Sequence, residues 1–178
     1  VAFEAATCEV LVGEAARRQA AGNPGNTFCD IKSKLTGRRF SDAAVQEYRS
    51  RAAWYRIAAK CPFELPGDPL CDKPVVRVAC AGLERFLEPE QLTALLLAGI
   101  RRRAEARAGH PLGAVVVSVP AAWNHQQRKA TLDAASIAGL DCTHLVNEPT
   151  AAVLHAEQQR QRRTALGTRP GAAAGEPA

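Results

Sequence analysis

The sequence predicts an α/β protein in which helices cover a sheet, and two observations support this class. Between residues 89 and 157 the pattern alternates helix, strand, helix, strand and helix, an order typical of a sheet layer packed against helices. Hydrophobic residues make up 47% of the 178 residues. Hydrophobic runs such as 95–97 and 115–117 are far shorter than the ~18 residues that cross a bilayer. A membrane-spanning protein, a collagen and a wholly disordered chain are therefore excluded.

Short elements separated by turns are predicted in the first part of the chain. Residues 1–3 are typical of the end of a strand, and 14–21 of a helix that the Gly, Asn and Pro of 22–26 terminate. Residues 27–35 have a helical pattern. Ser41 and Asp42 are suitable caps for a helix that we expect to run towards Ala59.

A hairpin and a long helix are predicted next. Alternating hydrophobic residues over 74–80 predict a strand, and 83–87 is expected to return beside it after the turn at Ala81 and Gly82. A helix is expected from Pro89 onwards, since proline and neighbouring glutamates suit a first helical turn.

The remaining elements supply the alternation that defines the fold class. The hydrophobic run 114–119 predicts a strand buried on both faces. Asn124 is a favourable N-cap for a helix over 126–138. A shorter strand is expected over 140–146, and Pro149 begins another helix.

The end of the chain carries much of its positive charge. The net charge is +5, and residues 158–178 are first rich in Gln and Arg and then in Gly, Ala and Pro, so we expect a disordered tail. One hypothesis is a basic nucleic-acid binder led by residues 160–169. The charge excess is small, and nucleic acid is therefore not the favoured partner.

The six cysteines give no metal-binding pattern. None forms a CxxC pair, and no histidine stands at zinc-ligand spacing from a pair of cysteines. An even number leaves a disulfide framework open, but scattered reduced thiols are the favoured interpretation. The start of the chain does not resemble a signal peptide, so we expect a cytoplasmic location.

A series of motifs in order identifies a family. The chain resembles the nucleotide-binding domain of the 70-kDa heat-shock chaperone family (heat shock protein 70) over roughly 1–155. The matching segments are Val12-Gly13-Glu14-Ala15-Ala16, Asn26-Thr27, Asp30-Ile31-Lys32, Gly37-Arg38-Arg39-Phe40, Val119-Pro120-Ala121, Gln127-Arg128, Ile137-Ala138-Gly139-Leu140 and Asn147-Glu148-Pro149-Thr150-Ala151-Ala152.

This resemblance implies an actin-like ATPase (ribonuclease-H-like) fold, of which only lobe I is expected here. Residues 1–87 would form its upper subdomain and 88–157 its incomplete α/β base. The family's first phosphate-binding hairpin would lie before Val1, and its second lobe would follow the chain. We therefore expect an incomplete domain that binds ATP poorly and does not hydrolyse it alone.

The resemblance also implies roles for four residues. Lys32 matches the catalytic lysine that helps place the attacking water. Glu148 matches the carboxylate that holds magnesium through its water shell. Pro120 and Arg128 match the interdomain switch. Phosphoryl transfer requires a cation and a carboxylate directed at magnesium. Spacing alone instead favours structural roles for the same residues. Lys32 and Arg128 would then be surface residues, Pro120 would end a strand and Glu148 would start a helix.

The full-length parent would couple ATP binding and hydrolysis to protein folding, with ATP or ADP and Mg²⁺ as cofactors. Its partners would be a J-domain co-chaperone, a nucleotide-exchange factor and unfolded clients that bind through a further domain. His144 stands where the family commonly has an arginine for J-domain docking, which weakens that expectation. The alternative hypothesis is a diverged, non-catalytic interaction module that keeps the lobe as a scaffold.

Overall fold

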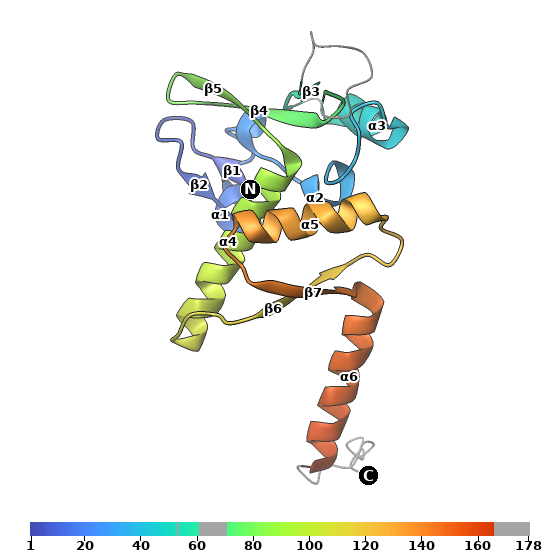
Figure 1. Cartoon of the computed structure of the whole chain (residues 1–178). Coiled ribbons are helices and arrows are strands. Elements are labelled where there is room, and N and C mark those ends of the chain that lie inside the picture. Colours follow the sequence, from blue (N-terminus) through green and yellow to red (C-terminus); the bar gives the residue numbers. More distant parts are fainter. Residues whose placement is uncertain (53, 61–70, 166–178) are drawn as a thin grey trace, which may run out of the picture.

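The computed structural model describes residues 1–52, 54–60 and 71–165. The small strands and short helices form an upper part, from which a long helix runs down beside a lower two-stranded sheet (Figure 1). In chain order the elements are β1 (Ala2–Phe3), β2 (Val10–Leu11), α1 (Glu14–Arg18), the 3₁₀ turn η1 (Pro24–Asn26), α2 (Ile31–Lys34), α3 (Ala43–Arg51), β3 (Ile57–Ala59), β4 (Pro74–Cys80), β5 (Leu83–Leu87), α4 (Pro89–Ala108), β6 (Val115–Val119), α5 (His125–Ile137), β7 (Cys142–Asn147) and α6 (Glu148–Ala165).

The upper sheet is antiparallel and has the order β3-β4-β5. The predicted hairpin is confirmed, with Val78 paired to Arg85 and Cys80 to Leu83. Its turn lies at Ala81 and Gly82, whose φ angles of 48° and 73° match the two left-handed residues that a tight hairpin turn requires.

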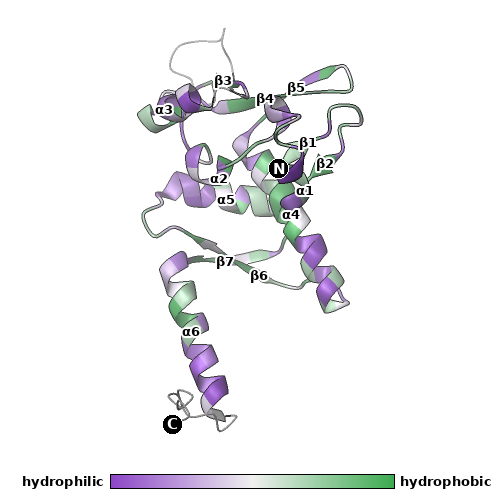
Figure 2. Cartoon of the chain, turned by 180° about the vertical axis from the view of Figure 1, so that it is seen from behind, coloured by the Kyte–Doolittle hydropathy of each residue, from purple (hydrophilic) through white to green (hydrophobic). Residues whose placement is uncertain are grey.

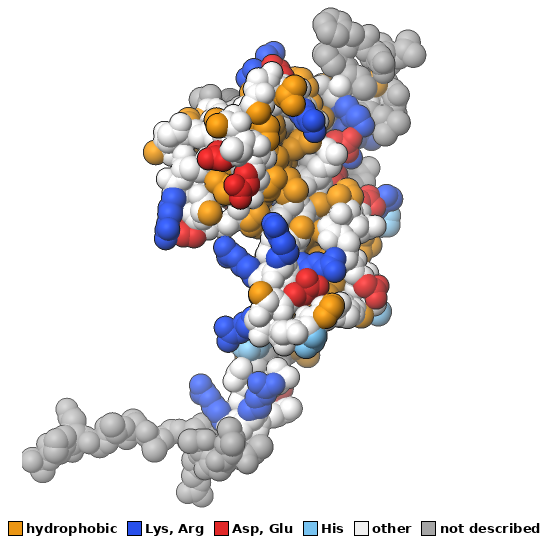
Figure 3. Space-filling view, turned by 90° about the vertical axis from the view of Figure 1, so that its left-hand side faces the viewer, with side chains coloured by type: hydrophobic (Ala, Val, Ile, Leu, Met, Phe, Trp, Pro, Cys, Tyr) orange, Lys and Arg blue, Asp and Glu red, His pale blue; other side chains and the backbone are white. Residues whose placement is uncertain are grey.

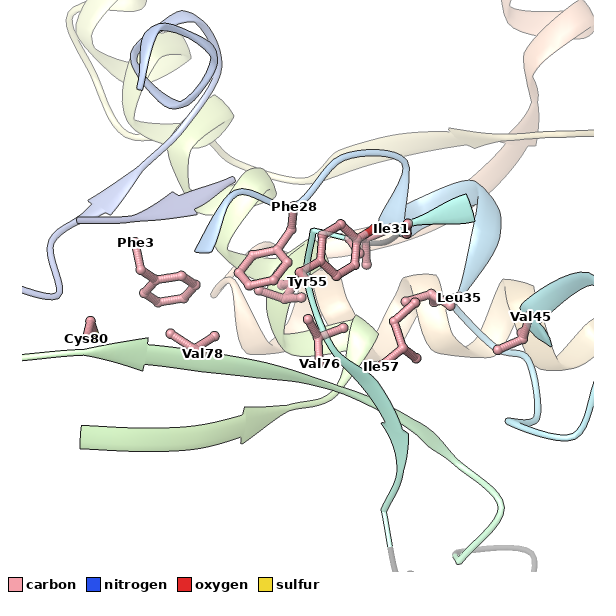
Figure 4. Close-up of a cluster of buried hydrophobic side chains, with 12 residues drawn as sticks. Phe3, Phe28, Ile31, Leu35, Val45, Tyr55, Ile57, Val76, Val78 and Cys80 are labelled. Carbon is pink, nitrogen blue, oxygen red and sulfur yellow. The ribbon is translucent and has the colours of Figure 1, made fainter. Parts of the chain in front are cut away.

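The core lies beneath this sheet. Phe28 meets Phe3 and Tyr55 edge-on, with ring centroids 6.2 and 5.1 Å apart (Figure 4). Val76 of β4 is fully buried, and Leu92 of α4 is 1% exposed in the same cluster. The core therefore crosses from the segment 1–87 into the first turn of α4.

Two predicted helix starts are confirmed by their caps. Glu88 is the N-cap of α4, with Pro89 in the first turn and Gln91 completing a capping box. Asn124 is the N-cap of α5, where its side chain accepts a hydrogen bond from the Gln127 amide at 2.9 Å.

The lower sheet pairs β6 with β7 in parallel, and α5 lies between this sheet and the upper part (Figure 1). The prediction that the strand of 114–119 is buried on both faces is wrong, since Val116 is 59% exposed. Only one pairing of β6 is present within the described ranges, which leaves its other edge open.

Two predicted helices are shorter than expected because sheet contacts compete for their residues. Within 27–35 only Ile31–Lys34 is helical, since Thr27 forms a bridge with Ala2 and Phe28 donates to the Val1 carbonyl. The helix from Ser41 and Asp42 ends at Arg51 rather than near Ala59. Residues 57–59 instead pair with β4, which buries Ile57.

The expectation of reduced thiols is wrong for one pair. Cys8 and Cys80 form a disulfide with a Cα–Cα distance of 5.3 Å. The bridge joins the loop between β1 and β2 to the end of β4. The two positions are 72 residues apart in sequence, so spacing alone gave no indication of the pair. Cys29 and Cys142 are free.

The C-terminal part is more regular than predicted. Helix α6 continues to Ala165, so the disordered tail predicted from 158 is wrong over 158–165, and residues 166–178 lie outside the described part. In Figure 2, α6 has a hydrophobic band near its start and is largely hydrophilic beyond it. None of the helices in the described ranges combines the length and hydrophobicity that a bilayer crossing needs.

The surface is uneven in character. Figure 3 shows hydrophobic side chains gathered over the upper half of one face, whereas Lys and Arg side chains are spread over the whole face, from its top down to α6. Leu83 and Phe86 on the edge strand β5 are 55% and 50% exposed. Exposed basic residues on α6 include Arg162 and Arg163.

Candidate functional site

The predicted site residues meet at the carboxyl ends of the parallel strands. Val119 at the end of β6 pairs with Asn147 at the end of β7. Pro120 and Glu148 follow these two residues directly. Parallel strands end at the same edge of a sheet, and this edge is where α/β folds commonly bind ligands.

Lys32 reaches this edge from the short helix α2. Its Nζ lies 3.3 Å from the Ser118 carbonyl oxygen and 3.3 Å from Glu148 Oε1. Asp30, which precedes α2, has a φ of 53°, and Ile31 is buried in the core. A side chain 116 residues away in sequence from Glu148 is thereby held against it.

Glu148 is the first residue of α6 and follows β7 without a loop. A carboxylate at a helix N-terminus is stabilised by the helix dipole. The side chains of Lys32 and Glu148 are 37% and 46% exposed. The pair therefore contributes at most about 1 kcal/mol to folding, and both groups are accessible to a ligand.

Trp123 is a part of the site that sequence reasoning missed. Lys32 Nζ lies 5.4 Å from the centroid of its ring, a distance at which a cation is attracted to an aromatic face. The position of Trp123 directly before the Asn124 cap, in the turn after β6, is the signal that could have placed it at this edge.

Arg128 connects the two strand ends. From α5 it donates through Nε to the Trp123 carbonyl at 3.1 Å and through a terminal nitrogen to Asn147 Oδ1 at 2.8 Å. The same terminal nitrogen lies 3.4 Å from the Ala121 carbonyl. Pro120 opens the turn that Arg128 holds, and its carbonyl accepts from the Trp123 amide at 3.1 Å.

A close approach fixes the upper part against α5. Gly37 has a φ of 66°, and a Cβ at this position would lie 2.5 Å from the Gln127 Cα. Only glycine tolerates both the backbone conformation and the contact. Because Gly37 follows α2 closely in sequence, this contact fixes the position of Lys32 relative to the carboxyl ends of β6 and β7.

Lys32 also lines a largely hydrophobic hollow of about 660 Å³. Its lining includes Phe28, Ile31, Leu92 and Leu96. These side chains suit packing against another hydrophobic surface rather than binding of a phosphate group.

The magnesium expectation rests on Glu148. No group of three or more His, Cys, Asp or Glu side chains suited to direct metal binding occurs in the described part of the chain. One accessible carboxylate is compatible with contact to a hydrated Mg²⁺, which typically keeps several of its waters.

Comparisons with known proteins identify the family. The family model described as Hsp70 protein matches residues 1–161. The chain is 46% identical over 147 residues to heat shock 70 kDa protein BIP3 of Oryza sativa, an alignment that covers 82% of this chain and 20% of that protein.

Two further relatives come from different groups of organisms. A ribosome-associated molecular chaperone of Zygosaccharomyces rouxii is 40% identical, and chaperone protein dnaK of Cyanidioschyzon merolae is 38% identical. Each alignment spans 146 residues, which is 82% of this chain and 22% of the relative. The chain thus spans about a fifth of the length of these relatives. It belongs to the Hsp70 family, and its α/β structure is part of lobe I of the actin-like nucleotide-binding domain.

Proposed function

We propose that this chain supplies the lobe I side of an ATP-hydrolysing site. The observation that carries the proposal is the meeting of Lys32 and Glu148, whose Nζ and Oε1 atoms lie 3.3 Å apart at the carboxyl ends of β6 and β7. The full-length parent would couple ATP binding and hydrolysis to the folding of client proteins.

Each residue has a defined task in this proposal. The Lys32 ammonium orients the attacking water and neutralises charge near the γ-phosphate, which suits a reaction that depends on positioning and electrostatics. Glu148 holds hydrated Mg²⁺ through water. When bound, that ion would neutralise phosphate charge.

Pro120 and Arg128 are proposed as the switch that transmits nucleotide state. Arg128 bonds both the turn after β6 and Asn147, the residue before Glu148. A change in the position of Glu148 would therefore reach the Pro120 turn through one side chain. A J-domain partner would couple weakly, because the residue at the docking position is the exposed His144.

The roles can be tested in a chimera in which residues 1–161 replace the matching segment of rice BIP3. Lys32→Ala and Glu148→Gln should each lower the single-turnover rate of ATP hydrolysis by about 10²–10³-fold. Lys34→Ala, which removes an exposed lysine from the same helix, should change the rate less than about twofold. Far-UV circular dichroism would verify folding. Hydrolysis by the Lys32→Ala chimera at the unsubstituted rate would refute the proposed role.

The chain by itself should bind Mg·ATP poorly. Lys32 and Glu148 provide a cation and one carboxylate, whereas strong phosphate binding generally requires several convergent backbone amides. Millimolar Mg·ATP should therefore leave the melting temperature unchanged in differential scanning fluorimetry. A clear upward shift that Lys32→Ala abolishes would contradict this prediction.

A further inference from the structure

An exposed tryptophan stands between two hollows beside α3. Trp54 is 56% exposed. It lines a hollow of about 440 Å³ and, together with Ala52, also lines a second hollow of about 360 Å³. Trp54 and the six cationic side chains of these hollows are termed the Trp54 surface. Its cations are Arg49, Arg56 and Arg77 in the first hollow and Lys34, Arg38 and Arg51 in the second.

The Trp54 surface has an excess of positive charge. The described lining of the first hollow contains no Asp or Glu, and the carboxylate near it is Glu84, 2.7 Å from Arg77 Nε. The second hollow contains Asp30 and Glu47, of which Glu47 pairs with Arg51 at 2.8 Å. Among the residues that the structure describes, six cations are thus matched by three carboxylates.

Two guanidinium nitrogens of this surface are buried and form no hydrogen bond within the described residues, the Nε atoms of Arg38 and Arg77. Arg77 Nε lies 2.7 Å from the Glu84 carboxylate, which leaves Arg38 Nε as the unsatisfied donor of the second hollow. Buried donors are almost always satisfied in native proteins. A guanidinium beside a hollow acquires an acceptor when an anionic group enters, and carboxylates match its forked geometry.

The base of the Trp54 surface is fixed. Tyr55 lines the first hollow and Tyr48 the second, and their hydroxyl groups are bonded to each other. The Tyr48 hydroxyl also donates to the Cys29 carbonyl at 2.8 Å. Trp54 is therefore presented next to a residue that is anchored in the core, which lowers the entropy cost of binding to it.

We propose that the Trp54 surface binds an acidic, extended segment of a partner protein, with a hydrophobic side chain of that segment resting on Trp54. An extended segment can enter both hollows at once. A tryptophan surrounded by arginines is typical of the residues that dominate protein interfaces. Surfaces for single-stranded nucleic acid instead carry series of stacking aromatics, whereas here the tyrosines are bonded to each other and Trp54 is the exposed ring.

The proposal can be tested with the full chain and a synthetic probe. The probe is a short fluorescein-labelled peptide of alternating Asp and Glu with one central Phe, and binding is measured by fluorescence anisotropy at physiological salt. Trp54→Ala and Arg56→Glu should each weaken binding by about tenfold or more. Arg102→Glu, a charge reversal at an exposed position on α4, should weaken it less than about twofold. Circular dichroism would verify that each variant is folded.

Several results would overturn the proposal. Absence of saturable peptide binding would do so, as would equal weakening by Arg56→Glu and Arg102→Glu, since that indicates general charge attraction. Tighter binding of a single-stranded oligonucleotide of equal charge would assign the surface to nucleic acid. A concentration-dependent dimer in sedimentation experiments that Trp54→Ala abolishes would assign it to a second copy of this chain.

Discussion

Gly37 shows how one residue connects the two parts of the candidate site. It lies between α2, which carries Lys32, and α3, and its backbone rests on the first turn of α5. Helix α5 in turn carries Arg128, which holds both strand ends. A side chain at position 37 would separate the lysine from the edge where Glu148 lies.

Gly37→Ala should therefore destabilise the fold strongly. The substituted residue would have a left-handed φ of 66° and a Cβ 2.5 Å from the Gln127 Cα. We expect a loss of about 2 kcal/mol or more in the free energy of unfolding, measured by urea denaturation. Gly82→Ala is the matched control, with a φ of 73° and nothing within 4 Å of the added Cβ. It should cost about 1 kcal/mol. Equal losses at both positions would show that the contact with α5 is unimportant.

The individual residues of the site were predictable to different degrees. The family motifs placed Lys32 and Glu148, and the structure brings these two together. The cation–π contact of Trp123 was not predictable, because it depends on the position that the Lys32 ammonium, distant in sequence, takes in the folded chain. The Ser118 carbonyl was missed for a similar reason, since any residue could supply a backbone acceptor there.

At the scale of elements, the start of α4 depends on a cluster of charges. Glu88 accepts from Lys60 at 2.6 Å and from Lys73, and Lys73 also lies 3.3 Å from the buried carboxylate of Glu90. Burial pushes the pKa of Glu88 upward, but the hydrogen bonds from the two lysines outweigh it and hold this pKa below its usual 4.5. The cluster fastens the N-terminus of α4 to β3 and β4.

This cluster should make stability depend on acid pH. A carboxyl whose pKa is lowered by folding stabilises the native state above its unfolded pKa, and the contribution is lost as pH falls through the folded pKa. Glu88→Gln, which keeps a side-chain acceptor for the helix cap, should cost about 1 kcal/mol at pH 7. The difference in melting temperature between this variant and the native chain should shrink as pH falls below 4.5 and vanish below the lowered pKa of Glu88 in the folded state. A difference that persists at low pH would show that charge is not the cause.

The elements that were predicted incorrectly are those in which tertiary pairing overrides local preference. The pattern of 41–59 favoured one helix, but Tyr55 and Ile57 are buried and 57–59 pairs with β4. The strand 74–80 and the helix capped by Asn124 were predictable because periodicity and capping are local signals. The strand within 114–119 was predicted correctly from its hydrophobic run. Burial of both its faces requires elements packed on each side of the sheet, and within the described residues Val116 stays exposed.

At the scale of the whole molecule, the Cys8–Cys80 bridge links the loop between β1 and β2 to the β4–β5 hairpin. A backbone hydrogen bond of 2.7 Å from the Ala81 amide to the Ala5 carbonyl lies beside it. Phe3 of β1 and Val78 of β4 also belong to the same buried cluster. Such bridges are typical of proteins that fold in oxidising compartments, and the expectation of a cytoplasmic location stays a prediction.

Removal of the bridge should lower the stability of the whole fold. A cross-link between positions 72 residues apart restricts the unfolded chain by about 4 kcal/mol in the loop-entropy description. The double variant Cys8→Ser/Cys80→Ser should lose about this much in urea denaturation, and a thiol reductant should lower the native chain to the same midpoint. Cys29→Ser, which removes an exposed free thiol, should leave the midpoint unchanged. If the double variant matches the native chain under oxidising conditions, the bridge does not constrain the unfolded state, and the core around Phe28 and Val76 must supply the stability alone.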